Sequence, residues 1–333
     1  MQQMGDEAGA SPGRFVAGFT WGDYLEGLTR DHGTLTAVAE RVAAARSWQD
    51  DVASIERALR RLRLRGLRPG GKWGSLLLRV FGLPEAVEAR LRWMASYHSR
   101  FADLPVGVCE DLVRLWDHPP TTERSDSRVW ITLARASIAL RRNDAAAAKE
   151  LLQSAERTLP QAPLAARIEA ELMAAYIQGP SSRDEALRRL HEVEALVLAL
   201  PPGEDRTCYE ARVLDQRAFQ LNRESSADRA TAKTLYERIP SKDAPPFVLW
   251  RRANGLAYAT WKEGDRAAAR KHAQDALRHA GDGGHLRLRV MSLNMLAHID
   301  PEHPDVPDIL TRAVAITKRI EDDMLLARLE RRR

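Results

Sequence analysis

One short stretch of this 333-residue chain concentrates positive charge. Residues 57–79 hold eight basic and no acidic side chains, whereas residues 14–56 hold four basic and seven acidic ones and residues 80–118 hold four and six. Guanidinium groups bind phosphates and carboxylates through paired hydrogen bonds. We therefore expect this stretch to contact a nucleic acid or an acidic partner. The candidate residues are Arg57, Arg60, Arg61, Arg63, Arg65, Arg68 and Lys72.

The basic stretch begins on the second of two predicted helices, 34–45 and 51–65, which weakly resemble a helix-turn-helix DNA-binding motif. Small Ala39 in the first helix and the arginines of the second fit that motif. Two features oppose it: the turn, residues 46–49, contains no glycine, and the second helix begins with Asp50 and Asp51, which repel phosphates. The alternative is a packed helical domain whose basic face is solvated, docks on an acidic protein or contacts nucleic acid without reading its sequence.

Catalytic patterns are absent from the sequence. The segment His191-Glu192-Val193-Glu194 lacks the second histidine of a metalloprotease helix, and the chain has no phosphate-binding loop and no nucleophile elbow. Cys109 and Cys208 are about 100 residues apart on apolar helical patterns, which favours buried packing. A site that joins Cys109 to a histidine and an acidic residue is the one enzymatic alternative left open. We expect no enzymatic activity, no cofactor and no metal.

The composition favours helices. Hydrophobic residues make up 44% of the chain and aromatic residues 6%, so that Ala and Leu supply most of the apolar side chains. No stretch approaches the roughly 20 apolar residues that span a bilayer, and the N-terminal residues are acidic rather than basic. We therefore expect an all-α, cytoplasmic protein that does not bind membranes. The excess of arginine over lysine is typical of a GC-rich bacterial genome.

Breaks in helical periodicity divide the chain into four predicted parts. Residues 1–13 form a disordered leader, and residues 14–118 form an N-terminal domain of six short helices. Thr34 is expected to cap the helix that follows it, and Ser47 or Asp50 the next one. Residues 119–127 change composition abruptly and contain two adjacent prolines, as in a linker, and residues 128–333 read as paired helices.

The paired helices contain an internal repeat, which is clearest when residues 129–160 are aligned with residues 250–281. Small residues recur at equivalent positions, Ala136, Ala148 and Ala155 in the first unit and Ala257, Ala269 and Ala276 in the second. This pattern resembles the tetratricopeptide repeat (TPR) family over about residues 128–320. The resemblance implies a right-handed α-solenoid of about five helix pairs, closed by a C-terminal capping helix.

In that family the first helices of the pairs line a groove, and here they carry polar side chains suited to carboxylate-bearing peptide segments. The candidate groove residues are Arg128, Arg135, Arg142, Arg167, Arg212, Gln216, Arg251, Asn254, Tyr258 and Arg287. The alternative is that arginine simply covers the outer surface of each helix. We interpret the chain as a non-enzymatic adaptor or inhibitor that binds a partner protein. The alternative is a DNA-binding transcriptional regulator with the repeats as its sensor.

Overall fold

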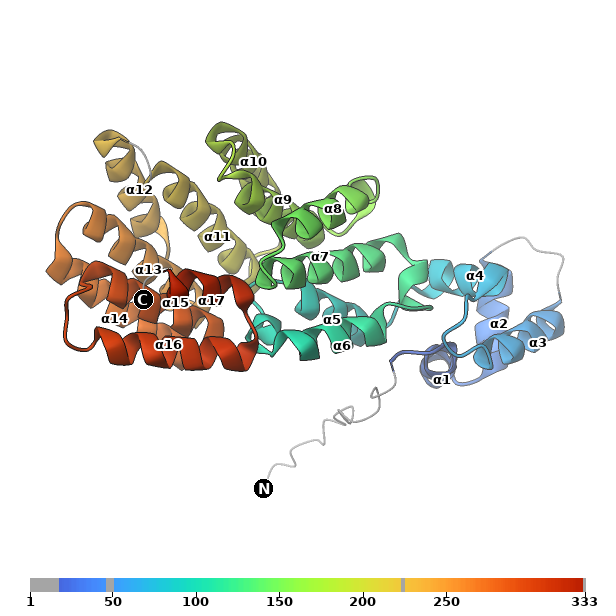
Figure 1. Ribbon diagram of the computed structural model, residues 1–333. Coiled ribbons are helices and arrows are strands. Elements are labelled where there is room, and N and C mark those ends of the chain that lie inside the picture. Colours follow the sequence, from blue (N-terminus) through green and yellow to red (C-terminus); the bar gives the residue numbers. More distant parts are fainter. Residues whose placement is uncertain (1–17, 46–50, 223–224, 332–333) are drawn as a thin grey trace, which may run out of the picture. The chain divides into compact units, whose positions relative to one another are not determined.

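The computed structural model describes residues 18–45, 51–222 and 225–331 (Figure 1). These residues form seventeen α-helices and three short 3-10 helices and contain no β-strand, which confirms the predicted all-α class. The predicted leader, residues 1–13, and the turn of the suggested helix-turn-helix motif, residues 46–49, lie outside the described residues. None of the described helices is long and apolar enough to cross a bilayer.

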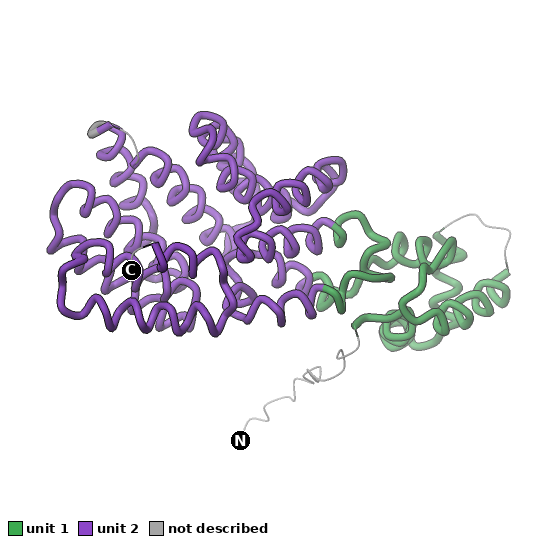
Figure 2. Tube along the Cα trace, in the orientation of Figure 1, with its two compact units in different colours: residues 1–88, 114–128 green, residues 89–113, 129–333 purple. Residues whose placement is uncertain are grey.

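The chain divides into two compact units, shown in Figure 2. The first comprises residues 1–88 and 114–128, and the second comprises residues 89–113 and 129–333. The predicted N-terminal domain, 14–118, is thus shared between the two units, because residues 89–113 belong to the second unit. Helices α5 (Glu85–Ala95), α6 (Val106–Trp116) and α7 (Ser125–Arg141) each contain residues of both units.

The first unit contains α1 (Trp21–His32), α2 (Leu35–Ala44), α3 (Val52–Arg63) and α4 (Gly71–Phe81). Thr34 caps α2 as predicted, because its hydroxyl accepts from the Ala37 amide at 3.0 Å. Asp51 caps α3, accepting from the Ser54 amide at 2.6 Å, so the predicted caps Ser47 and Asp50 are wrong. An aspartate directly before the helix reaches the free amide of the third helical residue.

The core of the first unit is built around Trp21, whose side chain is fully buried. Its indole Nε1 donates to the Arg68 carbonyl at 3.0 Å, and α3 packs its Ile55 and Leu59 side chains into the same unit. A Cβ atom at Gly70 or Gly74 would overlap the Trp21 ring. Gly70, directly before α4, and Gly74, within it, are therefore required by close packing on the Trp21 ring.

The segment predicted as a linker, 119–127, is ordered and packed in the first unit. Residues Thr121–Glu123 form a 3-10 helix, and α7 begins at Ser125. The Glu123 carboxylate accepts from the Gly70 amide at 2.5 Å, and Arg124 donates to the Leu78 carbonyl at 3.1 Å. These bonds tie the segment to the N-terminus and to the body of α4.

The second unit continues with α8 to α17. Their bounds are α8 Ala145–Ala155, α9 Leu164–Gln178, α10 Arg183–Leu198, α11 Glu204–Leu221, α12 Ser226–Arg238, α13 Pro246–Lys262, α14 Arg266–Asp282, α15 Leu286–Ile299, α16 Val306–Ile320 and α17 Asp323–Glu330. From α9 onward each helix packs on the next, and α13 also packs on α11 and α15. The small residues that define the repeat are all buried, including Ala257, Ala269 and Ala276, which lets paired helices approach closely.

Residues 96–105 connect α5 to α6 and contact distant parts of the second unit. The 3-10 helix Arg100–Asp103 lies against α15, where the Asp103 carboxylate accepts from the Arg287 amide at 2.8 Å. The turn after α16 is held nearby, because buried Arg141 donates to the carbonyls of Leu104 at 2.7 Å and Ile320 at 2.6 Å. Segments more than 200 residues apart in the sequence thus meet at one cluster of polar contacts, which we call the polar centre and which includes Asp103, Arg141 and Arg287.

Candidate functional site

Three of the predicted groove arginines meet at this polar centre, around one tyrosine. Arg212 on α11, Arg251 on α13 and Arg287 on α15 place their guanidinium carbons 5.1, 5.1 and 5.3 Å from the Tyr97 ring centre. Such distances are those of cation–π contacts. Burial acts to raise the pKa of the Tyr97 hydroxyl, whereas the three nearby positive charges act to lower it. The effect of the charges is larger, so this pKa lies below its ordinary value.

Each of these arginines also has its own carboxylate partner. Arg212 pairs with Glu169 of α9 at 2.5 Å, and Arg287 pairs with Asp322 at 2.8 Å. Arg251 pairs with Asp215 of α11. All three arginines are buried, at 3, 8 and 7% exposure. Their charges are balanced inside the unit, so in this structure they are not open to the carboxylate of a partner.

The residues next to Tyr97 complete the polar centre. The Tyr97 amide donates to Glu169 at 3.0 Å, and His98 Nε2 lies 3.1 Å from an Asp205 oxygen. Burial, with nearby arginines, lowers the pKa of His98 to about 4 despite the opposing charge of Glu169. The His98 ring is therefore neutral at physiological pH, and its contact with Asp205 is a hydrogen bond rather than an ion pair.

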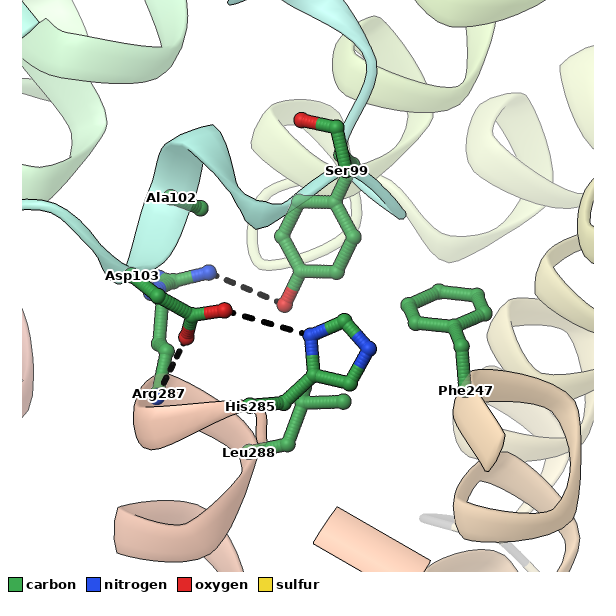
Figure 3. Close-up of a pocket in the computed structure, with 8 residues that line it drawn as sticks. Ser99, Ala102, Asp103, Phe247, His285, Arg287 and Leu288 are labelled. Atoms are coloured by element: carbon green, nitrogen blue, oxygen red, sulfur yellow. Dashed lines mark hydrogen bonds and ion pairs between the residues drawn. The ribbon is translucent and has the colours of Figure 1, made fainter. Parts of the chain in front are cut away.

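A small cavity adjoins this centre (Figure 3). Its lining residues are Tyr97, Ser99, Ala102, Asp103, Phe247, His285, Arg287 and Leu288. The Asp103 carboxylate lies between the His285 ring, 3.2 Å from Nδ1, and the Arg287 amide. Burial acts to raise the pKa of Asp103, whereas these hydrogen bonds act to lower it. The effect of the hydrogen bonds is larger, so this pKa lies below its ordinary value. The cavity volume of about 10 Å³ is at the lower limit for one water molecule, which is too small for a substrate.

A row of aromatic side chains lies further along the same helices. We call Phe219, Tyr258, Trp261 and His298 the aromatic row. Ring centres are 5.9 Å apart for Phe219 and Tyr258, 5.8 Å for Tyr258 and Trp261, and 4.1 Å for Trp261 and His298. The Phe219 side chain is 45% exposed, and the other three are partly exposed. Three helices, α11, α13 and α15, therefore present rings to solvent.

Two asparagines lie one helical turn before rings of this row. Asn254 precedes Tyr258 on α13 and Asn294 precedes His298 on α15, each by four residues. The side-chain oxygens of both asparagines are buried and accept no hydrogen bond within the described chain. A buried oxygen without a donor costs free energy, so both positions are unfavourable for the described part of the folded chain.

The predicted groove residues include Asn254 and Tyr258 but not Phe219, Trp261 or His298. Phe219 follows Arg212 by seven residues, and His298 follows Arg287 by eleven, which are both helical repeats of the same face. Trp261 follows Tyr258 by three. The signal in the sequence is the 3.6-residue helical period. When this period is followed from each groove arginine toward the C-terminus of its helix, it leads to the aromatic row.

The remaining predicted groove residues do not join one site. Arg142 pairs with Glu110 at 3.1 Å and lies 3.6 Å from Asp323, and Arg128 belongs to the first unit, where it donates to the Thr122 carbonyl at 2.6 Å. Arg135 is exposed, whereas Arg167 and Gln216 are half-buried. The predicted set thus separates into buried ion pairs, surface contacts and the two members that lie at the aromatic row.

The basic stretch of the first unit lies on its surface. All seven predicted residues are exposed. Arg60 pairs with Glu56 at 2.5 Å, Arg65 donates to the Pro69 carbonyl at 2.5 Å, and the Lys72 ammonium lies 5.4 Å from the Trp73 ring centre. Within the described residues, no hydrogen bond or ion pair engages the side chains of Arg57, Arg61, Arg63 and Arg68.

Both cysteines are buried and free of disulfide bonds. Cys109 is fully buried, its Sγ lies 3.4 Å from an Arg141 nitrogen, and burial raises its pKa above the ordinary value. Burial also raises the pKa of Cys208 to about 12. A protonated, buried thiol is a poor nucleophile. No group of three or more His, Cys, Asp or Glu in the described part of the chain is placed to hold a metal ion.

Comparisons with known proteins give no relative for this chain. A scan against family models, a search of curated proteins and a search of solved structures each find no match. What the chain binds is therefore inferred from its own side chains.

Proposed function

We propose that this chain is a regulatory adaptor or inhibitor whose second unit binds an extended segment of a partner protein. In this proposal the helix pairs form a TPR-like right-handed α-solenoid, and the partner lies along the first helices of the pairs. The observation that carries the proposal is the aromatic row, which leaves Phe219 and its neighbours partly exposed on three successive first helices. Partly exposed aromatic side chains are the usual anchors of binding energy at protein interfaces.

The state of the arginines changes the kind of partner segment expected. Arg212, Arg251 and Arg287 are neutralised by Glu169, Asp215 and Asp322, so they do not form a clamp for a partner carboxylate. Rings of the row instead accept apolar side chains. We therefore propose an apolar peptide segment rather than an acidic chain end.

Affinity capture from native lysate with quantitative mass spectrometry tests this function. The bait proteins are the full wild-type chain, a Phe219→Ala/Trp261→Ala variant and a matched Leu198→Ala control, which removes an exposed apolar side chain of α10 at 59% exposure. We expect the wild type and the control to recover the same stoichiometric partner and the double variant to lose it at least tenfold, because truncating an interface anchor costs about 2 kcal/mol or more. Equal recovery by all three, or no stoichiometric partner, would show that the aromatic row is not the site.

A further inference from the structure

The outer face of α3 in the first unit is a second surface, separate from the aromatic row. The helix buries Ile55, Ala58, Leu59 and Leu62 on one side. Its other side and the turn that follows carry the four unpaired arginines, Arg57, Arg61, Arg63 and Arg68. An unpaired, exposed guanidinium keeps its full charge for a partner. Because the whole stretch 57–79 contains no acidic residue, this surface is complementary to an extended polyanion.

The acidic residues of α3 lie at the other end and are already engaged. Asp51 caps the helix through the Ser54 amide, and Glu56 accepts from Thr36 at 3.0 Å and from Arg60 at 2.5 Å. A helix that reads bases places its N-terminal residues at their edges. Here that end carries negative charge, whereas the positive charge begins at Arg57, the sixth of the twelve helical residues, and continues into the turn after the helix.

We propose that the first unit binds the phosphate backbone of duplex DNA, without reading base sequence, through Arg57, Arg61, Arg63 and Arg68. Duplex DNA carries one negative charge per about 1.7 Å of its axis, and α3, with twelve residues, is about 18 Å long. Several phosphates therefore face the helix at once. The planar guanidinium forms two parallel hydrogen bonds to a phosphate, and arginine supplies seven of the eight basic residues in the stretch.

Two exposed leucines allow an experiment to distinguish DNA from the other anionic partners. Leu64 is 80% exposed and Leu67 is 42% exposed, and both lie in the turn after α3. An anionic lipid surface or an acidic protein would bury these side chains, and binding would depend on them. The arginines extend along the helix beyond the leucines, which favours a rod-shaped polyanion. A phosphate backbone requires the arginines and leaves the leucines in solvent.

Fluorescence anisotropy of the full chain with two 20-base-pair duplexes of unrelated sequence tests the proposal. With four phosphate contacts, the logarithm of the association constant should fall with the logarithm of the salt concentration at a slope of about −3.6. This slope corresponds to about 150-fold weaker binding at 200 mM than at 50 mM salt. An Arg57→Ala/Arg61→Ala variant should reduce the slope to about −1.8. Both duplexes should bind equally.

Two matched variants and one further ligand complete the experiment. Lys318→Ala/Arg319→Ala removes two exposed charges from α16 in the second unit and should leave the slope unchanged. Leu64→Asn/Leu67→Asn should retain DNA binding. No binding at 50 mM salt, or equal effects of the two charge-removing variants, would overturn the proposal. Binding of the chain to phosphatidylglycerol vesicles that is lost with the leucines, in place of DNA binding, would overturn it in favour of a lipid surface.

Discussion

Arg287 donates a hydrogen bond to the hydroxyl of Tyr97 at 2.9 Å across 190 residues of sequence. The same arginine pairs with Asp322 at 2.8 Å, and its backbone amide donates to Asp103. One side chain on α15 thereby joins the α5–α6 connection to the turn after α16. Buried ion pairs and hydrogen bonds hold the centre of unit 2 together, while Glu169 Oε2, Arg212 Nε and Arg251 Nε have no hydrogen-bond partner among the described residues.

The Tyr97 hydroxyl is expected to stabilise the fold. Tyr97→Phe keeps the ring among the three arginines and removes the hydrogen bond from Arg287. Because the donor is charged and buried, we expect the free energy of unfolding to fall by about 1.5–3 kcal/mol. The matched change Tyr176→Phe removes a hydrogen bond from Arg328 at a tyrosine that is 39% exposed, and should cost less than about 0.5 kcal/mol. Urea unfolding measures both, and equal losses would contradict the expectation.

The pair of Glu169 and Arg212 is expected to show strong coupling. Glu169→Gln leaves the Arg212 charge buried without a counterion, which costs about 3–5 kcal/mol. Replacing both residues, as Glu169→Leu/Arg212→Met, removes the two charges together and should be much less destabilising than the sum of the single changes. A double-mutant cycle by chemical unfolding measures the coupling. Additive single and double effects would show that the pair contributes through packing alone.

His98 makes stability depend on pH. Its pKa is about 4 in the folded chain, against an ordinary value near 6.5, so the unfolded state takes up the proton first as pH falls. The stabilising contribution is complete above pH 6.5 and is lost toward pH 4. We expect the free energy of unfolding to fall by about 2 kcal/mol between about pH 7.5 and about pH 5.

A glutamine in place of His98 stays neutral and should remove this part of the pH dependence. His191→Gln is the matched control, because the His191 side chain is 81% exposed on α10. Thermal unfolding followed by circular dichroism at both pH values compares the three proteins. An unchanged pH dependence in His98→Gln would assign the effect to other groups.

Two helical glycines should respond oppositely to alanine. A Cβ atom at Gly255 on α13 would overlap the buried Tyr236 ring, so Gly255→Ala should lower the free energy of unfolding by about 1–3 kcal/mol. Gly281 on α14 has no atom within 4 Å of such a Cβ, and Gly281→Ala should raise it by about 0.5–1 kcal/mol through helix propensity. Differential scanning calorimetry separates the two. A destabilising Gly281→Ala would contradict the helix-propensity argument.

Features that depend on local sequence were predictable. The all-α class follows from composition and periodicity, and the Thr34 cap from a hydroxyl placed just before a helix. Repeat positions such as Ala257 and Ala269 are buried as their spacing requires. The α3 cap was assigned wrongly by one residue from Asp50, because several polar residues precede that helix and only the backbone decides which one reaches its amides.

Features that depend on distant partners were not predictable. Arg212, Arg251 and Arg287 were predicted to line a partner-binding groove. Arg212 is buried against Glu169, 43 residues away, and all three contact the ring of Tyr97, which lies in a segment assigned to another domain. The sequence pattern around an arginine does not show whether its side chain faces solvent or a carboxylate. The pairing depends on how the helices pack.

The sequence by itself determined the helices, the small residues that let them pair and the concentration of arginine between residues 57 and 79, because each depends on spacing along one chain segment. The tertiary structure decided which charges remain available. It buries Arg212, Arg251 and Arg287 in ion pairs, whereas it leaves Arg57 and Arg61 exposed. The physical reason is that the cost of desolvating a charge, and its compensation by a counterion, depend on neighbours in space rather than in sequence.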